Sequence, residues 1–231
     1  METAVWTVSR QLDTMSKRSD WTLLSEELLW RELVSCMLGS MVSFEHAQSA
    51  VDHLWSAGLL DINKCLGHPQ LFELMLFEAL SKPIYLPETS SGIGRKYRYP
   101  KLRANHIRRT AEAIYQLNGS IKNLLYFNRD SRDTRMKIVR IAIGIGPKQA
   151  SLFLRNIGYA DNLAILDRHV LQYMFLLNLL PEKTKEMTSL SVYIATEDKL
   201  RIYAKRIKTH LSRLDTAIWV VMRVFQKEFM K

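Results

Sequence analysis

Hydrophobic residues recur at helical spacing along most of the chain, with polar residues at the positions between them. From residue 21 to 38 a helix-spaced stripe of apolar residues, which predicts one helix, is formed by Leu24, Leu28, Leu29, Leu33, Val34 and Met37. Similar patterns predict helices over 44–55, 70–80 and 101–117, and two more within 190–231. Strands have little support anywhere, so the pattern predicts an all-α fold.

The stretch 83–100 breaks the helical pattern, because it holds three prolines, two glycines and two serines. It ends in the run Arg95-Lys96-Tyr97-Arg98-Tyr99, where basic and aromatic side chains alternate. That composition suits contact with a nucleic-acid backbone together with base stacking. A solvated linker explains the stretch equally well.

The charge of the chain narrows the class of partner. A net charge of +10 over 231 residues predicts attraction to polyanions, either nucleic acid or an anionic membrane surface. No apolar run approaches the length of a membrane-spanning helix, and the first residues lack the apolar centre of a signal peptide. Two cysteines exclude a four-cysteine metal or iron–sulfur site made by this chain alone, and they fit a reducing cytosol.

The most informative segment is Ile138-Val-Arg-Ile-Ala-Ile-Gly-Ile-Gly-Pro-Lys-Gln-Ala-Ser151. Its first helix is predicted to end at Gly144, and Gly146 with Pro147 begins a second helix that stops at Gly158. Such a turn directs backbone N–H groups outward at a helix N-terminus, where they bind a phosphate oxygen. We expect Ile145 to pack into the hairpin core and fix the turn.

Two polar residues follow at helix starts. Lys148 lies in the first turn of the second helix, where the helix dipole disfavours a cation. It is a phosphate clamp, a nucleophilic amine, or an exposed lysine without a role. Asp167 lies 19 residues further on and directly precedes another predicted helix. It is either a helix cap or a carboxylate that shares a cleft with Lys148.

The run Gly144 to Met174 resembles the helix-hairpin-helix DNA glycosylases. Its sequence, Gly-Ile-Gly-Pro-Lys-Gln-Ala-Ser followed by Ile-Leu-Asp-Arg-His, is similar to that of the type 2 8-oxoguanine DNA glycosylase/AP lyases. The segments Tyr97–Ile107 and Leu214–Trp219, and the final lysine, also resemble this family. The resemblance implies a two-lobed helical fold with the active-site cleft between the lobes. We expect one lobe over 1–100 plus 190–231, and the other over 101–189, containing the hairpin 134–158.

The resemblance also implies a mechanism, in which the enzyme flips the damaged nucleotide out of the duplex. Lys148 would attack the sugar and form a Schiff base that permits β-elimination, and Asp167 would assist departure of the base. It implies DNA contacts by Gly144, Ile145, Gly146, Arg98, Arg103 and Arg168. It implies a base pocket formed by Tyr99, Trp219 and Lys231. No cofactor and no metal are implied. We expect a cytoplasmic, nucleoid-associated monomer that binds DNA containing oxidised guanine and no membrane.

Two other functions stay open at this point. One is a helix-hairpin-helix glycosylase with another base preference. The other is a non-catalytic DNA-binding module that uses Lys148 only to clamp a phosphate.

Overall fold

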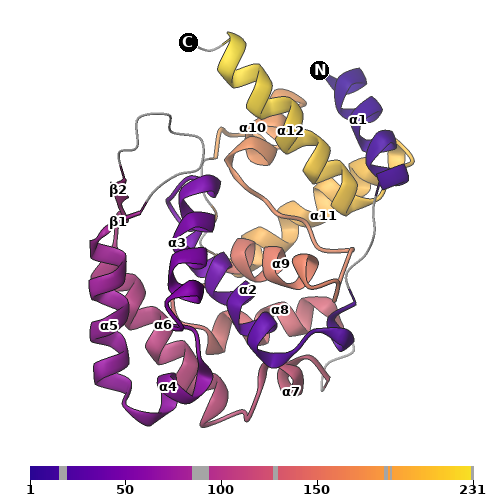
Figure 1. Ribbon diagram of the computed structural model, residues 1–231. Coiled ribbons are helices and arrows are strands. Elements are labelled where there is room, and N and C mark those ends of the chain that lie inside the picture. Colours follow the sequence, from indigo (N-terminus) through magenta and orange to yellow (C-terminus); the bar gives the residue numbers. More distant parts are fainter. Residues whose placement is uncertain (16–19, 85–93, 127–129, 185–186, 188, 230–231) are drawn as a thin grey trace. The chain divides into compact units, whose positions relative to one another are not determined.

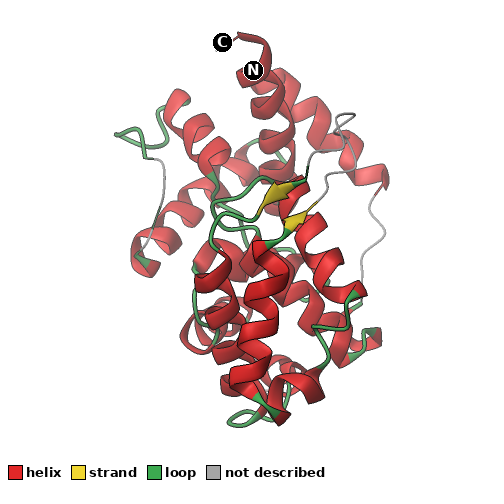
Figure 2. Cartoon of the chain, turned by 60° about the vertical axis from the view of Figure 1, so that its left-hand side comes forward, coloured by secondary structure: helices red, strands yellow, loops and turns green. Residues whose placement is uncertain are grey.

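A computed structural model describes residues 1–231 apart from 16–19, 85–93, 127–129, 185–186, 188 and 230–231. Within the described residues, regular structure consists of twelve α-helices, a 3-10 helix and two strands of two residues each. Figure 2 shows how little strand there is. The predicted all-α class is confirmed.

The chain forms two compact units. The smaller unit combines Met1–Ser19 with Gly158–Lys231, and the larger unit is the continuous stretch Asp20–Ile157. The lobe boundaries expected at residues 100 and 190 stay a prediction. No helix of the described residues is both long enough and apolar enough to cross a membrane.

The larger unit contains most of the helices. Its elements are the 3-10 helix η1 (Trp21–Leu23), α2 (Glu26–Leu38), α3 (Phe44–Ser56), α4 (Ile62–Gly67), α5 (Pro69–Ser81), β1 (Pro83–Ile84), β2 (Arg95–Lys96), α6 (Pro100–Tyr115), α7 (Ile121–Tyr126), α8 (Ser131–Ile141) and α9 (Pro147–Asn156). Helices α5 and α6 pack side by side, and α2 contacts both α3 and α9 (Figure 1). Leu29, Trp30 and Leu33 of α2 are buried in its core, as are Phe153 and Leu154 of α9.

The helix predicted over 21–38 is interrupted, and this prediction was wrong in its first part. Leu24 has an extended backbone between η1 and α2. The Ser25 hydroxyl accepts the N–H of Leu28 and so caps α2, whose first turn carries Glu26 and Glu27. An N-cap followed by acidic residues is a helix-start signal, and here it outweighs the apolar stripe that continues upstream.

Two short strands replace part of the loop predicted over 83–100. Pro83 pairs with Lys96 and Ile84 with Arg95 in an antiparallel arrangement, in a stretch whose pattern offers strands little support. Gly94 permits the close approach, because a Cβ atom at this position would lie 2.8 Å from the Cβ of Pro83. The rest of the predicted loop, residues 85–93, lies outside the described residues.

The smaller unit joins the two ends of the chain. It contains α1 (Glu2–Met15), α10 (Arg168–Leu176), α11 (Leu190–Arg206) and α12 (Leu211–Phe229). Helix α1 packs along α12, indigo beside yellow in Figure 1. Val5 of α1 joins Tyr173, Leu200 and Ile218 in one buried apolar cluster. The two helices predicted within 190–231 are confirmed.

Candidate active site

The hairpin that the sequence predicts is formed by α8, the turn 142–146 and α9. Asp130 caps α8 by accepting the N–H groups of Arg132 and Asp133 at 2.7 and 3.1 Å. The first helix ends at Ile141, earlier than predicted, and Ala142 closes it by donating to the Ile138 carbonyl at 2.8 Å. Ile145 is only 4% exposed, which confirms that it packs into the hairpin.

The two glycines of the turn have different conformations. Gly144 has a φ of +77°, in the left-handed region that favours glycine. Gly146 has an ordinary extended backbone and stands at the N-cap of α9, where it supplies no side chain to cap the helix. The first N–H groups of a helix have no intrahelical acceptor. Pro147 has no N–H, so in α9 the unpaired donors of the first turn are the N–H groups of Lys148 and Gln149. These N–H groups are open to an acceptor outside the helix, and phosphate binding by the turn stays a prediction.

A buried arginine joins the two helices of the hairpin. Arg135 of α8 is fully buried, and its Nη1 donates to the Ser151 hydroxyl of α9 at 3.2 Å. Arg135 is not among the functional residues predicted from the sequence. It could have been found in the sequence, because Arg135 is a charged residue on the same face of the predicted helix as the apolar Ile138.

Lys148 occupies the second position of α9, and its side chain is half-buried. It makes no ion pair or side-chain hydrogen bond with any residue that the structure describes. The thiol of Cys36 in α2 lies near enough to interact electrostatically with Lys148. Burial raises the pKa of this thiol well above its ordinary value. The neighbouring Glu32 carboxylate raises this pKa further, and the Lys148 charge lowers it. Lys148 is thus an amine in the first turn of α9 whose nitrogen is not engaged by any of the described side chains.

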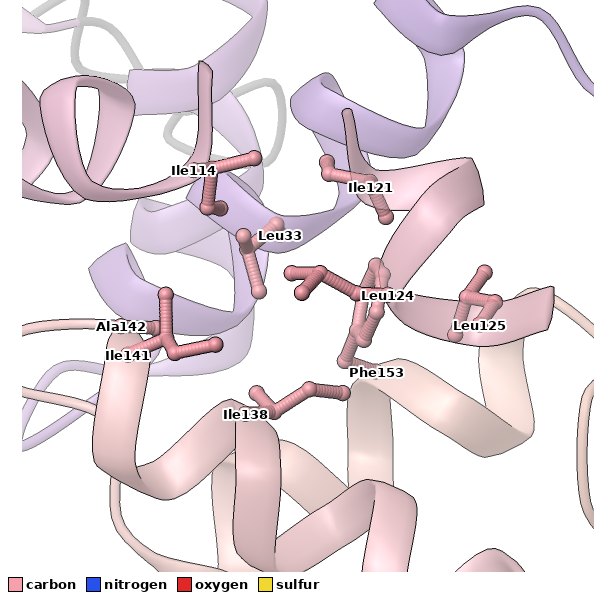
Figure 3. Close-up of a pocket in the computed structure, with 9 residues that line it drawn as sticks. All are labelled: Leu33, Ile114, Ile121, Leu124, Leu125, Ile138, Ile141, Ala142 and Phe153. Carbon is pink, nitrogen blue, oxygen red and sulfur yellow. The ribbon is translucent and has the colours of Figure 1, made fainter. Parts of the chain in front are cut away.

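A small cavity under the hairpin is not a base pocket. Its volume is about 10 Å³, and its lining is wholly apolar, as Figure 3 shows. The lining residues are Leu33, Ile114, Ile121, Leu124, Leu125, Ile138, Ile141, Ala142 and Phe153. Pockets for small ligands measure roughly 300–1,000 Å³. The cavity is a packing gap between the hairpin and the core of the larger unit.

Asp167 caps α10 in the smaller unit. Its Oδ1 accepts the N–H groups of His169 and Val170, each at 2.9 Å. Its Oδ2 has no hydrogen-bond partner in the part of the chain that the structure describes. One oxygen therefore serves the helix, and the other is available to a ligand. The expectation that Asp167 and Lys148 converge on one cleft stays a prediction.

The segment that carries Asp167 is held in place by buried polar side chains of α11 and α12. The Ala164 N–H donates to the Glu197 carboxylate and the Ile165 N–H to Asp215, both at 2.7 Å. The Tyr193 hydroxyl accepts the Leu166 N–H at 3.0 Å. These three side chains are at most 2% exposed. They replace the strand or helix partners that this extended segment lacks, and thereby position Asp167.

Sequence reasoning gave these three residues no role. Tyr193 and Glu197 stand four residues apart on the buried face of α11, which also carries Leu200 and Ala204, and polar groups on such a face were the available signal. Asp215 belongs to the Leu214–Trp219 segment that carries part of the family resemblance. Its contact with Ile165, 50 residues away, has no signature in the local pattern.

The basic and aromatic residues predicted to bind DNA are partly buried. Arg98 is exposed, and its guanidinium lies 5.0 Å from the centre of the half-buried Tyr99 ring. Tyr97 is buried and donates from its hydroxyl to the Leu38 carbonyl at 2.6 Å, so it serves the core. Arg103 is 5% exposed and donates to the Ser40 carbonyl at 3.3 Å. The DNA contacts of Arg98 and Arg103, and the base contact of Tyr99, stay predictions.

The predicted residues of the smaller unit lie on α10 and α12. Arg168 is exposed, and its Nε donates to His169 Nε2 at 3.4 Å. Trp219 is half-buried, with the Arg223 guanidinium 5.0 Å from the ring centre. Lys231 lies outside the described residues. The roles of these three in DNA or base binding stay predictions.

Among the residues that the structure describes, the cysteines and the acidic and histidine side chains do not assemble a metal site. Cys36 and Cys65 are both free and buried. Over the described ranges, no group of three or more His, Cys, Asp or Glu side chains lies close enough to hold a metal ion.

Comparisons with known proteins place this geometry in context. A family described as 8-oxoguanine DNA glycosylase matches residues 87–209, the range that contains the hairpin, Lys148 and Asp167. The 8-oxoguanine DNA glycosylase/AP lyase of Saccharolobus solfataricus is 33% identical over 198 residues, which cover 85% of this chain and 83% of that protein.

Two solved structures share the fold. The 8-oxoguanine DNA glycosylase of Thermotoga maritima matches with a TM-score of 0.65 at 29% identity, over 95% of this chain and 89% of that chain. The Methanocaldococcus jannaschii 8-oxoguanine glycosylase/lyase, solved in complex with a 15-mer DNA containing 8-oxoguanine, also has a TM-score of 0.65, at 24% identity. That alignment likewise covers 95% of this chain and 89% of the other.

Proposed function

The chain belongs to the 8-oxoguanine DNA glycosylase family, and we propose that it excises 8-oxoguanine with Lys148 as nucleophile and then cleaves the abasic strand. Relatives named 8-oxoguanine DNA glycosylase/AP lyase, 30% and 33% identical to the chain, support both activities. One observation carries the assignment of the nucleophile. The Lys148 amine stands beside the outward N–H groups of the hairpin without a hydrogen-bond or ion-pair partner in the described residues.

The reaction begins with attack by the Lys148 amine on C1′ of the damaged nucleotide. The bond between C1′ and the base breaks, and the base leaves with the electron pair and takes up a proton. Opening of the sugar ring then breaks the C1′–O4′ bond and gives a Schiff base between Lys148 and C1′. Loss of a proton from C2′ expels the 3′ phosphate, which cleaves the strand.

Asp167 stabilises the positive charge that develops on the sugar as the base departs. Its Oδ2 is suited to this role because Oδ1 alone satisfies the two N–H groups at the start of α10. The hairpin N–H groups hold a DNA phosphate, and Tyr99 and Trp219 stack on the flipped base. Arg98 and Arg168, both exposed, bind the backbone. Lys231 contacts the base.

The partner is DNA, and the net charge of +10 favours its binding. We propose that the enzyme acts as a monomer, because one chain carries both Lys148 and Asp167. We also propose that it is associated with the nucleoid of a prokaryotic cell, as its affinity for duplex DNA would dictate.

Borohydride trapping tests the nucleophile. Incubation of the enzyme with a duplex containing 8-oxoguanine, in the presence of borohydride, should reduce the Schiff base to a stable covalent adduct. The adduct should be lost in Lys148→Gln. Lys199→Gln, at an exposed position on α11, is the matched control and should be trapped like the wild type.

The opposite results separate the alternatives. Wild-type protein that binds duplex in a salt-sensitive way but gives no adduct would be a DNA-binding module. An adduct that survives in Lys148→Gln would assign the nucleophile to another amine. Strong trapping with uracil or thymine glycol but none with 8-oxoguanine would change the base preference.

A further inference from the structure

One face of α6 lies against the turn of the hairpin. Thr110 accepts the Ile143 N–H on its hydroxyl at 2.9 Å. One turn earlier, the His106 ring packs directly on Gly144, because a Cβ atom at Gly144 would lie 2.0 Å from His106 Nδ1. The hairpin turn therefore rests on α6 at two successive positions of one helical face.

The contact with Arg103 determines which ring nitrogen of His106 carries the proton. Its Nη1 lies 3.3 Å from His106 Nδ1. A guanidinium has only donors, so Nδ1 accepts and the ring proton of His106 is on Nε2. Burial lowers the pKa of His106, and the charges of Arg103 and Arg109 lower it further. The ring is thus a neutral donor whose Nε2–H has no partner among the described residues.

Arg103 is itself fixed by a second contact. It is 5% exposed, and its Nη2 donates to the carbonyl of Ser40, in the turn between α2 and α3. Arg103 is accordingly a positioning residue, which sets the orientation of the His106 ring against the hairpin.

We propose that His106 is a further phosphate ligand, whose Nε2–H donates to the DNA phosphate held by the hairpin turn. The inference rests on the proposed function, since it assumes that the hairpin binds DNA. The two charged groups that act on the His106 ring, Arg103 and Arg109, are both positive. The hairpin packs on the ring only through the uncharged backbone of Gly144. This environment favours an anionic oxygen as the acceptor.

Two substitutions at one position test the donor. His106→Gln places an amide N–H near the position of Nε2, whereas His106→Leu keeps the bulk of the ring and removes the donor. Affinity for an undamaged duplex is measured by fluorescence anisotropy over a series of salt concentrations. We expect His106→Leu to bind roughly three- to tenfold more weakly, the value of one hydrogen bond, and His106→Gln to stay within about twofold of wild type.

The salt dependence separates a neutral donor from a cation. A neutral Nε2–H releases no counterion, so the plots of log Kd against log salt should be parallel for wild type and His106→Leu. Loss of a cationic contact would instead reduce the slope by about 0.9. The ratio of the two affinities should also be the same at pH 6.5 and pH 8.

Three results would overturn the proposal: wild-type affinity in His106→Leu, a reduced salt slope, or equal weakening in Leu and Gln variants that unfold at the wild-type temperature. His106→Met is a second apolar variant, for use if leucine destabilises the fold. Lys199→Gln, at an exposed position on α11, is the matched control and should bind duplex and give borohydride adduct like the wild type. Failure of the proposed function would show instead as the absence of that adduct in the wild type.

Discussion

Asp167 is a residue whose structural and chemical roles fall on different atoms. Its Oδ1 accepts two backbone N–H groups at the start of α10, whereas its Oδ2 is unoccupied by any described residue. From the sequence alone, capping and catalysis are alternatives for this residue. The geometry shows that a single carboxylate accommodates both, and this makes the two roles separable by substitution.

Asp167→Asn keeps an oxygen at the cap and removes the charge, so it should fold like the wild type and lose excision. We expect the free energy of unfolding to change by less than about 0.5 kcal/mol, and excision to slow by at least about a hundredfold. Asp167→Ala is the comparison variant and should also lose about 1 kcal/mol of stability with the cap. Urea unfolding and single-turnover excision measure the two effects. Wild-type excision in Asp167→Asn would leave Asp167 as a helix cap only.

At the scale of elements, the hairpin depends on one of its two glycines far more than on the other. Gly144→Ala requires a side chain at φ +77° and places its Cβ within 2.0 Å of His106. A left-handed backbone costs roughly 1–2 kcal/mol in a residue with a Cβ, and the displaced imidazole adds to that. We therefore expect at least about 2 kcal/mol of destabilisation and weaker duplex binding.

Gly146→Ala is the matched control within the same turn. Its Cβ would meet only the Gln149 side chain, at 3.5 Å, an ordinary contact. Alanine is a poorer N-cap than glycine, so we expect a loss below about 1 kcal/mol in urea unfolding. Equal losses in the two variants would mean that the His106 contact does not constrain the turn.

Helix spacing predicted the long elements well and the short ones poorly. The predictions over 44–55 and 70–80 correspond to α3 and α5, at Phe44–Ser56 and Pro69–Ser81. Helices α4 and α7 have six residues each, fewer than two turns, so their apolar positions show no readable period. In the hairpin, Ile145 is buried and Gly146 stands at the N-cap of α9 as predicted, because turn chemistry depends on neighbouring residues. Gly144 has the left-handed backbone of a helix end, but α8 already ends at Ile141.

At the scale of the whole molecule, the unpredicted features are contacts between distant segments. Glu197 and Asp215 reach the backbone at 164 and 165 across 33 and 50 residues, and α1 packs on α12 at the opposite end of the chain. Composition suggests that acids lie at the surface, and no local pattern reveals which one is buried against a distant N–H. The residues that hold Asp167 in place were therefore found only in the structure.

Each compact unit contains a histidine whose pKa is lowered, and this predicts how stability depends on pH. Burial is the main cause for both His106 and His169. For His169 the Asp167 charge opposes the shift, whereas Arg168 and Arg223 reinforce it. In the unfolded chain both rings titrate near the ordinary value of 6.5. As the pH falls through that value, the unfolded chain binds protons that the folded protein does not, so the free energy of unfolding decreases.

The stability due to the two neutral rings should be fully present above about pH 7.5 and be lost progressively towards their folded pKa values. Urea midpoints at pH 7.5 and 5.5 measure the loss. It should be smaller in the double variant His106→Leu/His169→Gln, because the unfolded chain then has two fewer imidazoles to protonate. An unchanged loss in the double variant would assign the acid sensitivity to the carboxylates instead.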